Sequence, residues 1–335
     1  MQLKILALTD HFTHTKENSI YALLRKMIKH PAAEMVDVVS RGNPANRKFF
    51  QDFATNKLFA TRVTEEYVYQ TTGSQYINKT KIVKIEDYDA IVMRLPRPFE
   101  DDFLSYLESV FPDKPIINSP SVIIETSSKE YLLNFPELCP PMKLCKTPED
   151  VRAFASKFPI VLKPLKSYGG KGIVKIENGW VYGESDPVNF KVFLLDLEEI
   201  MEEENFLGMQ YLENVTQGDK RIVVVNGEVL GASLRLPPEN SWLCNVAQGG
   251  ASEAAEIDAD ERLIVETLSP KLLEKGIVMF GADTLMGNDG KRVLSEVNTM
   301  SIGGLAQIEE QSGRPVLQST VDLIFDYIEN NFNDA

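Results

Sequence analysis

The chain has 335 residues, of which 43% are hydrophobic and 25% charged, and its formal net charge is −14 at pH 7. This length predicts two or three domains, or one large α/β body with subdomains. The acidic balance argues against a general nucleic-acid or anionic-membrane binder, whose affinity comes from clustered Lys and Arg, but it permits a nucleotide ligand in a local basic pocket.

Cysteine usage and the amino-terminal segment predict a cytoplasmic protein. The three cysteines, Cys139, Cys145 and Cys244, are odd in number and have no metal-ligand spacing, which indicates reduced thiols. The apolar start at residues 3–8 is too short for a signal peptide and is expected to be a buried strand. No run of about 18 apolar residues occurs, so no membrane span is expected.

Residues 1–119 are expected to form an amino-terminal domain with a parallel sheet. Apolar runs and helical periodicity predict strands and helices in the order β–α–β–β–α–β, at residues 3–9, 17–29, 35–39, 88–94, 100–110 and 115–118. No GxGxxG fingerprint follows the first strand, which argues against a dinucleotide site. The polar stretch at 43–85 is expected to be an insertion, or a strand pair with mobile loops.

Arg94 and two histidines lie where the first-domain strands are predicted to end. Ligands of open α/β sheets bind outside the carboxyl ends of the strands, so Arg94 is a candidate substrate contact. A surface ion pair is the alternative. His11 and His14 are interpreted as loop histidines without a partner, with a position beside a site as the alternative.

The middle of the chain, residues 120–203, is expected to alternate short helices and strands around a glycine-rich loop. Lys163 ends a predicted strand, the loop at 165–172 follows, and a second strand begins at Ile173. Amides of such a loop are free to face an anion. The segment is therefore a candidate phosphate loop, with a glycine hairpin carrying solvated lysines as the alternative. It lacks the GxxxxGK[ST] pattern and no helix follows it.

A predicted hairpin near the start of the last third, residues 204–335, places two arginines together. Asn226-Gly227 is a strong hairpin turn signal between two apolar strands. Arg221 and Arg235 then lie at the open end of the hairpin, where they can clamp phosphate or carboxylate oxygens. Exposed ion pairs with the many acids are the alternative. Residues 237–256 lack periodicity, and a lid is expected at 241–257.

A second predicted hairpin carries a candidate metal site. Two short strands flank a turn at residues 287–290. Asp283 lies on one strand, and the period of two places Glu296 and Asn298 on one face of the other. Two carboxylates and an amide oxygen form an all-oxygen site of the kind that magnesium favours. A hairpin with a solvated polar face is the alternative.

In their order along the chain, these pieces resemble the ATP-grasp ligases, and within that superfamily the bacterial glutathione synthetases. The resemblance covers nearly the whole chain and rests on Lys129, Lys163-Pro164 with the Gly169-Gly170 loop, Gln210-Tyr211-Leu212, Gly218-Asp219-Lys220-Arg221, the Asn-Gly hairpin ending in Arg235, Asn245 with Gly249-Gly250, Asp283 and Glu296-Val297-Asn298. It implies an α/β ATP-grasp fold with an amino-terminal pre-ATP-grasp domain (1–119), a small α+β lid subdomain (120–203) and an antiparallel-sheet core (204–335).

The resemblance also implies roles for individual residues. ATP is expected to contact Lys129, Lys163, Ser167, Tyr168, Gly169, Gly170, Gln210, Tyr211, Leu212, Lys220 and Asn245. Asp283, Glu296 and Asn298 are expected to hold two magnesium ions, with manganese as a substitute. Arg221 and Arg235 are the expected catalytic residues. The expected substrate contacts are Arg94, Asn18, Ser301, Gly303 and Gly304.

The implied activity is ATP-dependent ligation of γ-glutamylcysteine and glycine through an acylphosphate. The expected partners are therefore a dipeptide and an amino acid, and the resemblance implies a homodimer or homotetramer. Ala251-Ser252 and Ser301-Ile302-Gly303-Gly304 depart from the usual glutathione synthetase pattern at the predicted acceptor end. The alternatives are another ATP-grasp peptide or amino-acid ligase with a different acceptor amine, and a non-catalytic nucleotide-binding regulator.

Overall fold

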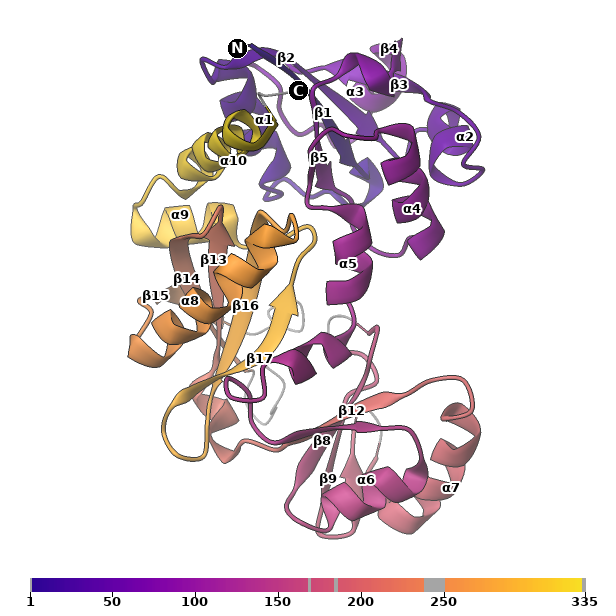
Figure 1. The fold of residues 1–335 in the computed structure, drawn as a ribbon, viewed down its shortest axis with the longest axis vertical. Helices are drawn as coiled ribbons and strands as arrows, with labels where there is room; N and C mark the ends of the chain where they lie inside the picture. Colours follow the sequence, from indigo (N-terminus) through magenta and orange to yellow (C-terminus); the bar gives the residue numbers. More distant parts are fainter. Residues whose placement is uncertain (1, 168–169, 184–185, 238–250, 333–335) are drawn as a thin grey trace.

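The computed structural model describes residues 2–167, 170–183, 186–237 and 251–332, whose strands form three sheets. Figure 1 shows the three sheets following one another along the long axis of the molecule, with sheet A at the top, sheet C in the middle and sheet B at the bottom. Parallel pairing is confined to sheet A, and sheets B and C are antiparallel in the described residues. The predicted α/β fold class is confirmed.

Sheet A has the strand order β4-β3-β2-β1-β5-β6. Its strands are Leu3–Thr9 (β1), Ala33–Ser40 (β2), Lys57–Arg62 (β3), Thr80–Lys84 (β4), Ala90–Arg94 (β5) and Ile116–Ile117 (β6). Strand β1 is a nearly continuous apolar run because helices bury both faces of this parallel region. The helices of this part are Ile20–Lys29 (α1), Arg47–Phe50 (α2), Gln75–Asn78 (α3) and Asp101–Val110 (α4).

The polar stretch at 43–85 contains the strand pair that was one of its two predicted forms. Strands β3 and β4 pair antiparallel and extend sheet A at the β2 edge. The short helices α2 and α3 lie before β3 and between the two strands. The stretch is therefore part of the sheet rather than a separate insertion.

Sheet B has the order β11-β10-β9-β8-β12-β7. Its strands are Met142–Cys145 (β7), Ile160–Pro164 (β8), Val174–Glu177 (β9), Trp180–Tyr182 (β10), Val188–Asn189 (β11) and Phe206–Gln210 (β12). Helices Pro148–Ala155 (α6) and Phe190–Ile200 (α7) bury apolar side chains against Ile160, Leu162 and Ile176 on one face. Because β12 lies between β8 and β7, this sheet extends past the boundary predicted at residue 203.

Sheet C has the order β15-β14-β13-β16-β17 and contains both predicted hairpins. Its strands are Asp219–Val225 (β13), Glu228–Leu236 (β14), Ala251–Ala255 (β15), Met279–Met286 (β16) and Arg292–Asn298 (β17). Asn226 and Gly227 both have positive φ, as a tight two-residue hairpin turn requires. Helix Ala259–Glu274 (α8) covers the face that carries Ile222 and Val224.

Further helices connect and follow the sheets. Helix Pro120–Thr126 (α5) is followed by the 3-10 helix Lys129–Asn134 (η4), which Ser128 caps. At the carboxyl end, Leu305–Ser312 (α9) and Val316–Phe332 (α10) are separated by Gly313 in the left-handed region. Of the expected lid, 241–250 lies outside the described residues, and Ala251–Ala255 is the edge strand β15.

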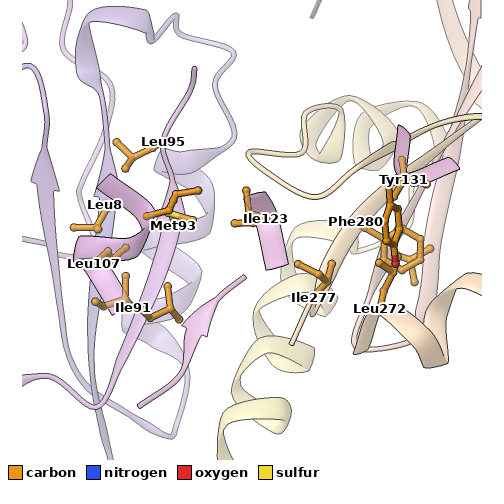
Figure 2. Close-up of a cluster of buried hydrophobic side chains, with 14 of the residues drawn as sticks. Leu8, Ile91, Met93, Leu95, Leu107, Ile123, Tyr131, Leu272, Ile277 and Phe280 are labelled. Carbon is orange, nitrogen blue, oxygen red and sulfur yellow. The ribbon is translucent and has the colours of Figure 1, made fainter. Parts of the chain in front are cut away.

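A shared core joins sheet A to the rest of the chain. Buried side chains from sheet A, such as Leu8 and Ile91, belong to the same cluster as Leu272 and Phe280 near sheet C. Figure 2 shows Ile123 of α5 between these two groups. Among the residues that the structure describes, no helix is both long enough and apolar enough to span a bilayer.

Candidate active site

The candidate site lies on the face of sheet C opposite α8. Successive side chains of a strand point to opposite faces, so Asp219 and Arg221 share a face while Lys220 points the other way. Helices α9 and α10 pack over Val223 and Val225 farther along this face. The end of the face that carries Asp219 and Arg221 also receives Arg235 and Asp283. The predicted meeting of the two arginines at the open end of the hairpin is confirmed.

Asp283 is the centre of this group. The Arg221 Nε and Nη2 donate to its Oδ1 and Oδ2 at 2.8 and 2.6 Å, and Arg235 Nη2 donates to Oδ2 at 2.9 Å. Burial opposes ionisation of Asp283, but the two guanidinium groups keep its pKa below the usual range. Arg235 also donates from Nε to Asp219 Oδ1 at 2.9 Å. Burial and the charge of Asp283 raise the pKa of Asp219.

Glu296 and Asn298 complete the predicted metal-ligand set on the neighbouring strand. In the register of β16 and β17, Asp283 is opposite Glu296, and Asn298 is opposite Gly281. Asn298 Nδ2 donates to Asp283 Oδ2 at 3.2 Å, so the three side chains are adjacent. Within the described part of the chain, no group of three or more His, Cys, Asp or Glu side chains gathers at metal-binding range. The candidate set therefore depends on the amide oxygen of Asn298 as its third protein ligand.

The buried Lys129 and the half-buried Lys163 face this acidic edge. Burial lowers the pKa of Lys129 and of Lys163, and the nearby charge of Glu296 opposes the shift in both. Asp219 and Asp283 also act on Lys163. Lys129 Nζ donates to the carbonyl of Ser167, and its backbone N–H donates to Leu165 O at 3.0 Å. Lys129 thereby ties the start of the glycine-rich loop to η4.

A cleft of about 260 Å³ opens beside these groups. Glu296 and Asn298 line one wall, and Lys129 lines another. The rest of the lining consists of Arg97, Thr126, Ser127, Ser128, Tyr131, Leu132, Val297, Thr299, Met300 and Ser301. Most of these residues belong to η4 or lie at the ends of α5 and β17, and Figure 1 shows α5 and β17 between sheet A and sheet B. A small substrate in this cleft would contact two of the candidate metal ligands, Glu296 and Asn298.

Three of the expected ATP contacts, Gln210, Tyr211 and Leu212, lie at the end of strand β12 and directly after it. The N–H groups of Gln210 and Tyr211 donate to Pro141 O and Pro159 O at 2.9 and 2.8 Å. The ammonium of Lys175 lies 4.1 Å from the centre of the Tyr211 ring and pairs with Glu177 at 2.8 Å. Leu212 is buried. The segment is thus held firmly between sheet B and the loops before β7 and β8.

Lys220 does not join the group around Asp283. Its amine donates to Glu261 Oε2 at 2.6 Å and to Glu256 O at 2.9 Å, beneath α8. Thr284 Oγ1 donates to the other oxygen of Glu261 at 2.6 Å. These contacts belong to the face of sheet C opposite Arg221. The prediction of Lys220 as an ATP contact therefore finds no geometric support, because the period of two directs this side chain away from the cleft.

The predicted substrate contacts lie where sheet A meets the core. Arg94 Nη2 donates to Ile302 O at 2.9 Å, and burial lowers its pKa to about 10. Asn18 accepts a hydrogen bond from Ile20 N at 3.0 Å and so begins α1. Ser301 lines the cleft. The last two contacts, Gly303 and Gly304, precede α9, and the φ of Gly304 is +93°.

The interpretation of His11 and His14 as loop histidines without partners is wrong. His14 lies between Thr9 Oγ1 at 2.9 Å and Tyr21 OH at 2.8 Å. His11 Nδ1 is 2.7 Å from Ser40 Oγ. Both histidines are buried, and burial lowers their pKa values, that of His14 to about 4. Thr9 and Tyr21 are near His14 in the sequence, whereas Ser40 lies in β2, and it is the packing of these elements that brings the groups together.

Two residues that line or border the site had no predicted role. Asp219 was part of the Gly-Asp-Lys-Arg motif, and the period of two from Arg221 was sufficient to place it on the same face. Arg97 follows β5 in a Pro-Arg-Pro sequence and lines the cleft. No periodicity marks it. Three predicted ATP contacts, Tyr168, Gly169 and Asn245, lie outside the described residues.

Comparisons with known proteins agree with this geometry. A profile of the family described as "Prokaryotic glutathione synthetase, ATP-grasp domain" matches residues 128–313. The glutathione synthetase of Bradyrhizobium diazoefficiens is 29% identical over 74% of this chain and 76% of its own length. The glutathione synthetase of Neisseria meningitidis serogroup A is 30% identical over 72% and 74%. A crystal structure of D-cycloserine synthetase DcsG matches the fold with a TM-score of 0.68 at 15% identity, over 97% of this chain and 99% of that one.

The fold and the cleft define an ATP-grasp protein, an ATP-dependent carbon–nitrogen ligase that uses magnesium. The profile match covers more than half of the sequence and includes η4, sheets B and C and α9. The chain belongs to the prokaryotic glutathione synthetase family. The predicted family and enzyme class are confirmed.

Proposed function

We propose that the protein joins γ-glutamylcysteine to glycine with ATP, giving glutathione, ADP and phosphate. The observation that carries this proposal is the convergence of Arg221 and Arg235 on Asp283, beside Glu296 and opposite the buried Lys129. This arrangement places fixed cations on both sides of an acidic, oxygen-rich edge. Phosphoryl transfer requires such positioning and charge stabilisation rather than a protein nucleophile.

The reaction proceeds in two balanced steps. A carboxylate oxygen of the cysteine residue of the donor attacks the γ-phosphorus of ATP, the bond to the β-phosphate oxygen breaks, and ADP leaves. The amine of glycine then attacks the acyl carbon, phosphate leaves with the original carboxylate oxygen, and the amine releases a proton. Phosphorylation is needed because an unactivated carboxylate has no good leaving group.

The side chains of this protein contribute to these steps by binding and orienting ATP and the substrates. Lys163 and Lys129 hold the phosphates of ATP, and Lys129 fixes the loop that starts at Ser167. Arg221 and Arg235 stabilise the charge of the transferring phosphoryl group and then the oxyanion of the tetrahedral intermediate. Exclusion of water is the proposed role of the lid expected at 241–257, because an acylphosphate hydrolyses readily.

The donor set fits magnesium. Glu296 and Asn298 line the cleft, and Asp283 is kept ionised by its two arginines. All their ligating atoms are oxygens, which suit a hard cation. We propose that these residues hold two ions, with manganese as a substitute. When bound, the ions would supply positive charge that stabilises the charge on the transferring phosphoryl group.

The substrates, the assembly, the location and the domain division are part of the same proposal. We propose a dipeptide and an amino acid as the small-molecule substrates, a homodimer or homotetramer as the working assembly, and the cytoplasm as the location. The domain division at residues 119 and 203 is likewise proposed, with β12 assigned to sheet B by its pairing. Light scattering of the purified protein measures the assembly directly.

The test of the function is product formation. Purified protein is incubated with ATP, magnesium and γ-glutamylcysteine, with and without glycine. The proposal expects phosphate release that depends on glycine, together with one glutathione per phosphate by mass spectrometry. Phosphate release without any dependence on glycine contradicts glycine as the acceptor. Other amino acids are then tested as acceptors with the same donor.

A further inference from the structure

Arg97 reaches the cleft from the amino-terminal domain. It follows β5 in the segment that connects sheet A to α4, whereas the candidate metal ligands come from sheet C. Its guanidinium carbon lies 4.9 Å from the centre of the Phe99 ring, so one flat face of the group is packed against an aromatic surface. Arg97 is thus a cation that a different domain contributes to the cleft.

The segment around Arg97 is fixed by Arg41 at the end of sheet A. Arg41 Nη1 donates to Pro98 O at 2.6 Å and Nη2 donates to Pro96 O at 3.1 Å. The same side chain donates from Nε to Asp10 Oδ2 at 2.8 Å. The carbonyls on both sides of Arg97 are therefore held by one guanidinium that is itself anchored. Such second contacts fix a binding residue in position before a ligand arrives.

Two more hydrogen bonds join this segment to the far end of the cleft. Ser301 Oγ donates to Leu95 O at 2.6 Å, and Arg94 Nη2 donates to Ile302 O at 2.9 Å. The turn after β17 and the segment after β5 therefore form one continuous wall. Arg97 lies on this wall, and Glu296 and Asn298 lie on the strand that leads into it.

We propose that Arg97 binds the carboxylate of the acceptor amino acid and so determines which amines the ligase accepts. This inference rests on the proposed function. A planar guanidinium recognises a carboxylate through two parallel hydrogen bonds, which gives both affinity and orientation. Holding the acceptor by its carboxylate leaves its amine facing the activated donor.

The position of Arg97 favours the acceptor over the donor. The reacting carboxyl of the donor must lie against Glu296 and Asn298, where the phosphoryl group and the metal are proposed to meet it. The amine attacks that same carbon, and in glycine the carboxylate is only one carbon away from the amine. A cation in the same cleft is therefore within reach of the acceptor. The remaining carboxylate of the donor lies at the opposite end of the dipeptide.

The experiment compares glycine with glycinamide, which lacks the negative charge, in the wild type and in Arg97→Ala. The measured quantities are KM and kcat for each amine, with ATP and γ-glutamylcysteine saturating, and then KM for the donor. Arg97→Lys keeps the positive charge but cannot donate two parallel hydrogen bonds to one carboxylate. Arg47→Ala is the matched control, because Arg47 belongs to the same domain and its side chain is 70% exposed.

We expect Arg97→Ala to raise KM for glycine roughly 10- to 100-fold, the range for loss of a charged hydrogen-bond pair. KM for glycinamide and for the donor stays within about twofold of the wild type, and Arg97→Lys gives an intermediate value for glycine. Arg47→Ala matches the wild type. A variant Arg97→Ala that still prefers glycine over glycinamide to the wild-type extent overturns the proposal, as does an effect confined to the donor KM.

Failure of the proposed function is a separate result. If the wild type forms no product with glycine, each amino acid that does support phosphate release is compared with its own amide in the same variants. Loss of that discrimination in Arg97→Ala supports the role of Arg97 with a different acceptor. If no amino acid supports release, thermal unfolding of the ATP–magnesium form is measured with each amino acid and its amide. Equal shifts in the wild type and Arg97→Ala overturn the inference.

Discussion

Arg221 and Asp283 stand opposite each other on strands β13 and β16 and are joined by two hydrogen bonds, of 2.8 and 2.6 Å. Arg235 adds a third bond to the same carboxylate at 2.9 Å. A proposed metal ligand is therefore already paired with two proposed catalytic cations. These pairs keep Asp283 ionised and hold both arginines at the place where the phosphoryl group is expected.

Replacing Asp283 by Asn tests the proposed metal site. The substitution removes the charge but keeps a side chain of the same shape. We expect kcat/KM for phosphate release to fall by at least about 100-fold, because charge stabilisation of the transferring group is lost. The measurement is phosphate release across a magnesium titration. Asp289→Asn is the control, since Asp289 lies in the turn of the same hairpin and accepts a hydrogen bond from the backbone N–H of Lys291. Normal activity of Asp283→Asn contradicts the assignment.

Replacing Lys163 by Met tests the proposed phosphate contacts. Burial lowers the pKa of Lys163, and the negative charge of Glu296 is the main influence that opposes this shift. Replacing Lys163 by Met therefore removes a positive charge that balances Glu296. We expect KM for ATP to rise roughly 10- to 100-fold. Lys166→Met is the matched control, because Lys166 lies three residues on and pairs with Asp101 at the surface. Equal effects of the two substitutions argue against a specific phosphate contact.

Replacing Lys220 by Met separates a structural role from the predicted role in ATP binding. The substitution removes the nearer cation from the buried Glu261 and leaves Arg292 at 3.9 Å, which costs about 3 kcal/mol of unfolding free energy. The change is read from denaturant unfolding. We expect the folded protein to keep its KM for ATP within about threefold, since Lys220 points away from the cleft. The double variant Lys220→Met with Glu261→Met recovers part of the stability. A large rise in KM for ATP in folded Lys220→Met restores the original prediction.

His14 gives the protein a specific pH dependence. Its pKa in the folded state is about 4, below the ordinary value of 6.5, mainly because of burial. The unfolded chain therefore binds a proton at His14 at a higher pH than the folded one. The resulting stability is fully present above about pH 6.5 and is lost as the pH falls toward 4. Between pH 7.5 and pH 5 the loss is about 2 kcal/mol.

The test is chemical denaturation of the wild type and of His14→Asn at these two pH values. The other titrating groups are common to both proteins. The difference between the two proteins in their loss of unfolding free energy therefore reports on His14. We expect the wild type to lose about 2 kcal/mol more unfolding free energy than the variant between pH 7.5 and 5. Identical losses show that His14 is protonated equally in the folded and unfolded states.

Local sequence signals were sufficient for the parts of the site that lie on one hairpin. The Asn226-Gly227 turn fixed the relation of Arg221 to Arg235, and the period of two placed Glu296 and Asn298 side by side. The same period shows that Lys220 faces away from Arg221. The prediction for Lys220 followed the family motif instead of the strand geometry.

The remaining features depend on contacts between distant segments. Arg97 enters the cleft only because Arg41 and Ser301 fix the backbone after β5 against the end of β17. His11 and His14 are buried by partners that belong to β2 and α1. No local pattern encodes how sheet A packs on the core, so these positions were not predictable from periodicity or motif.

The most direct test of the proposed ligase chemistry follows one oxygen atom. γ-Glutamylcysteine labelled with ¹⁸O in its cysteine carboxylate is incubated with ATP, magnesium, glycine and the enzyme, and the released phosphate is analysed by mass spectrometry. Activation through an acylphosphate predicts one ¹⁸O in each phosphate that accompanies a glutathione molecule. Unlabelled phosphate, formed in the same amount as glutathione, contradicts transfer of the phosphoryl group to the donor carboxylate.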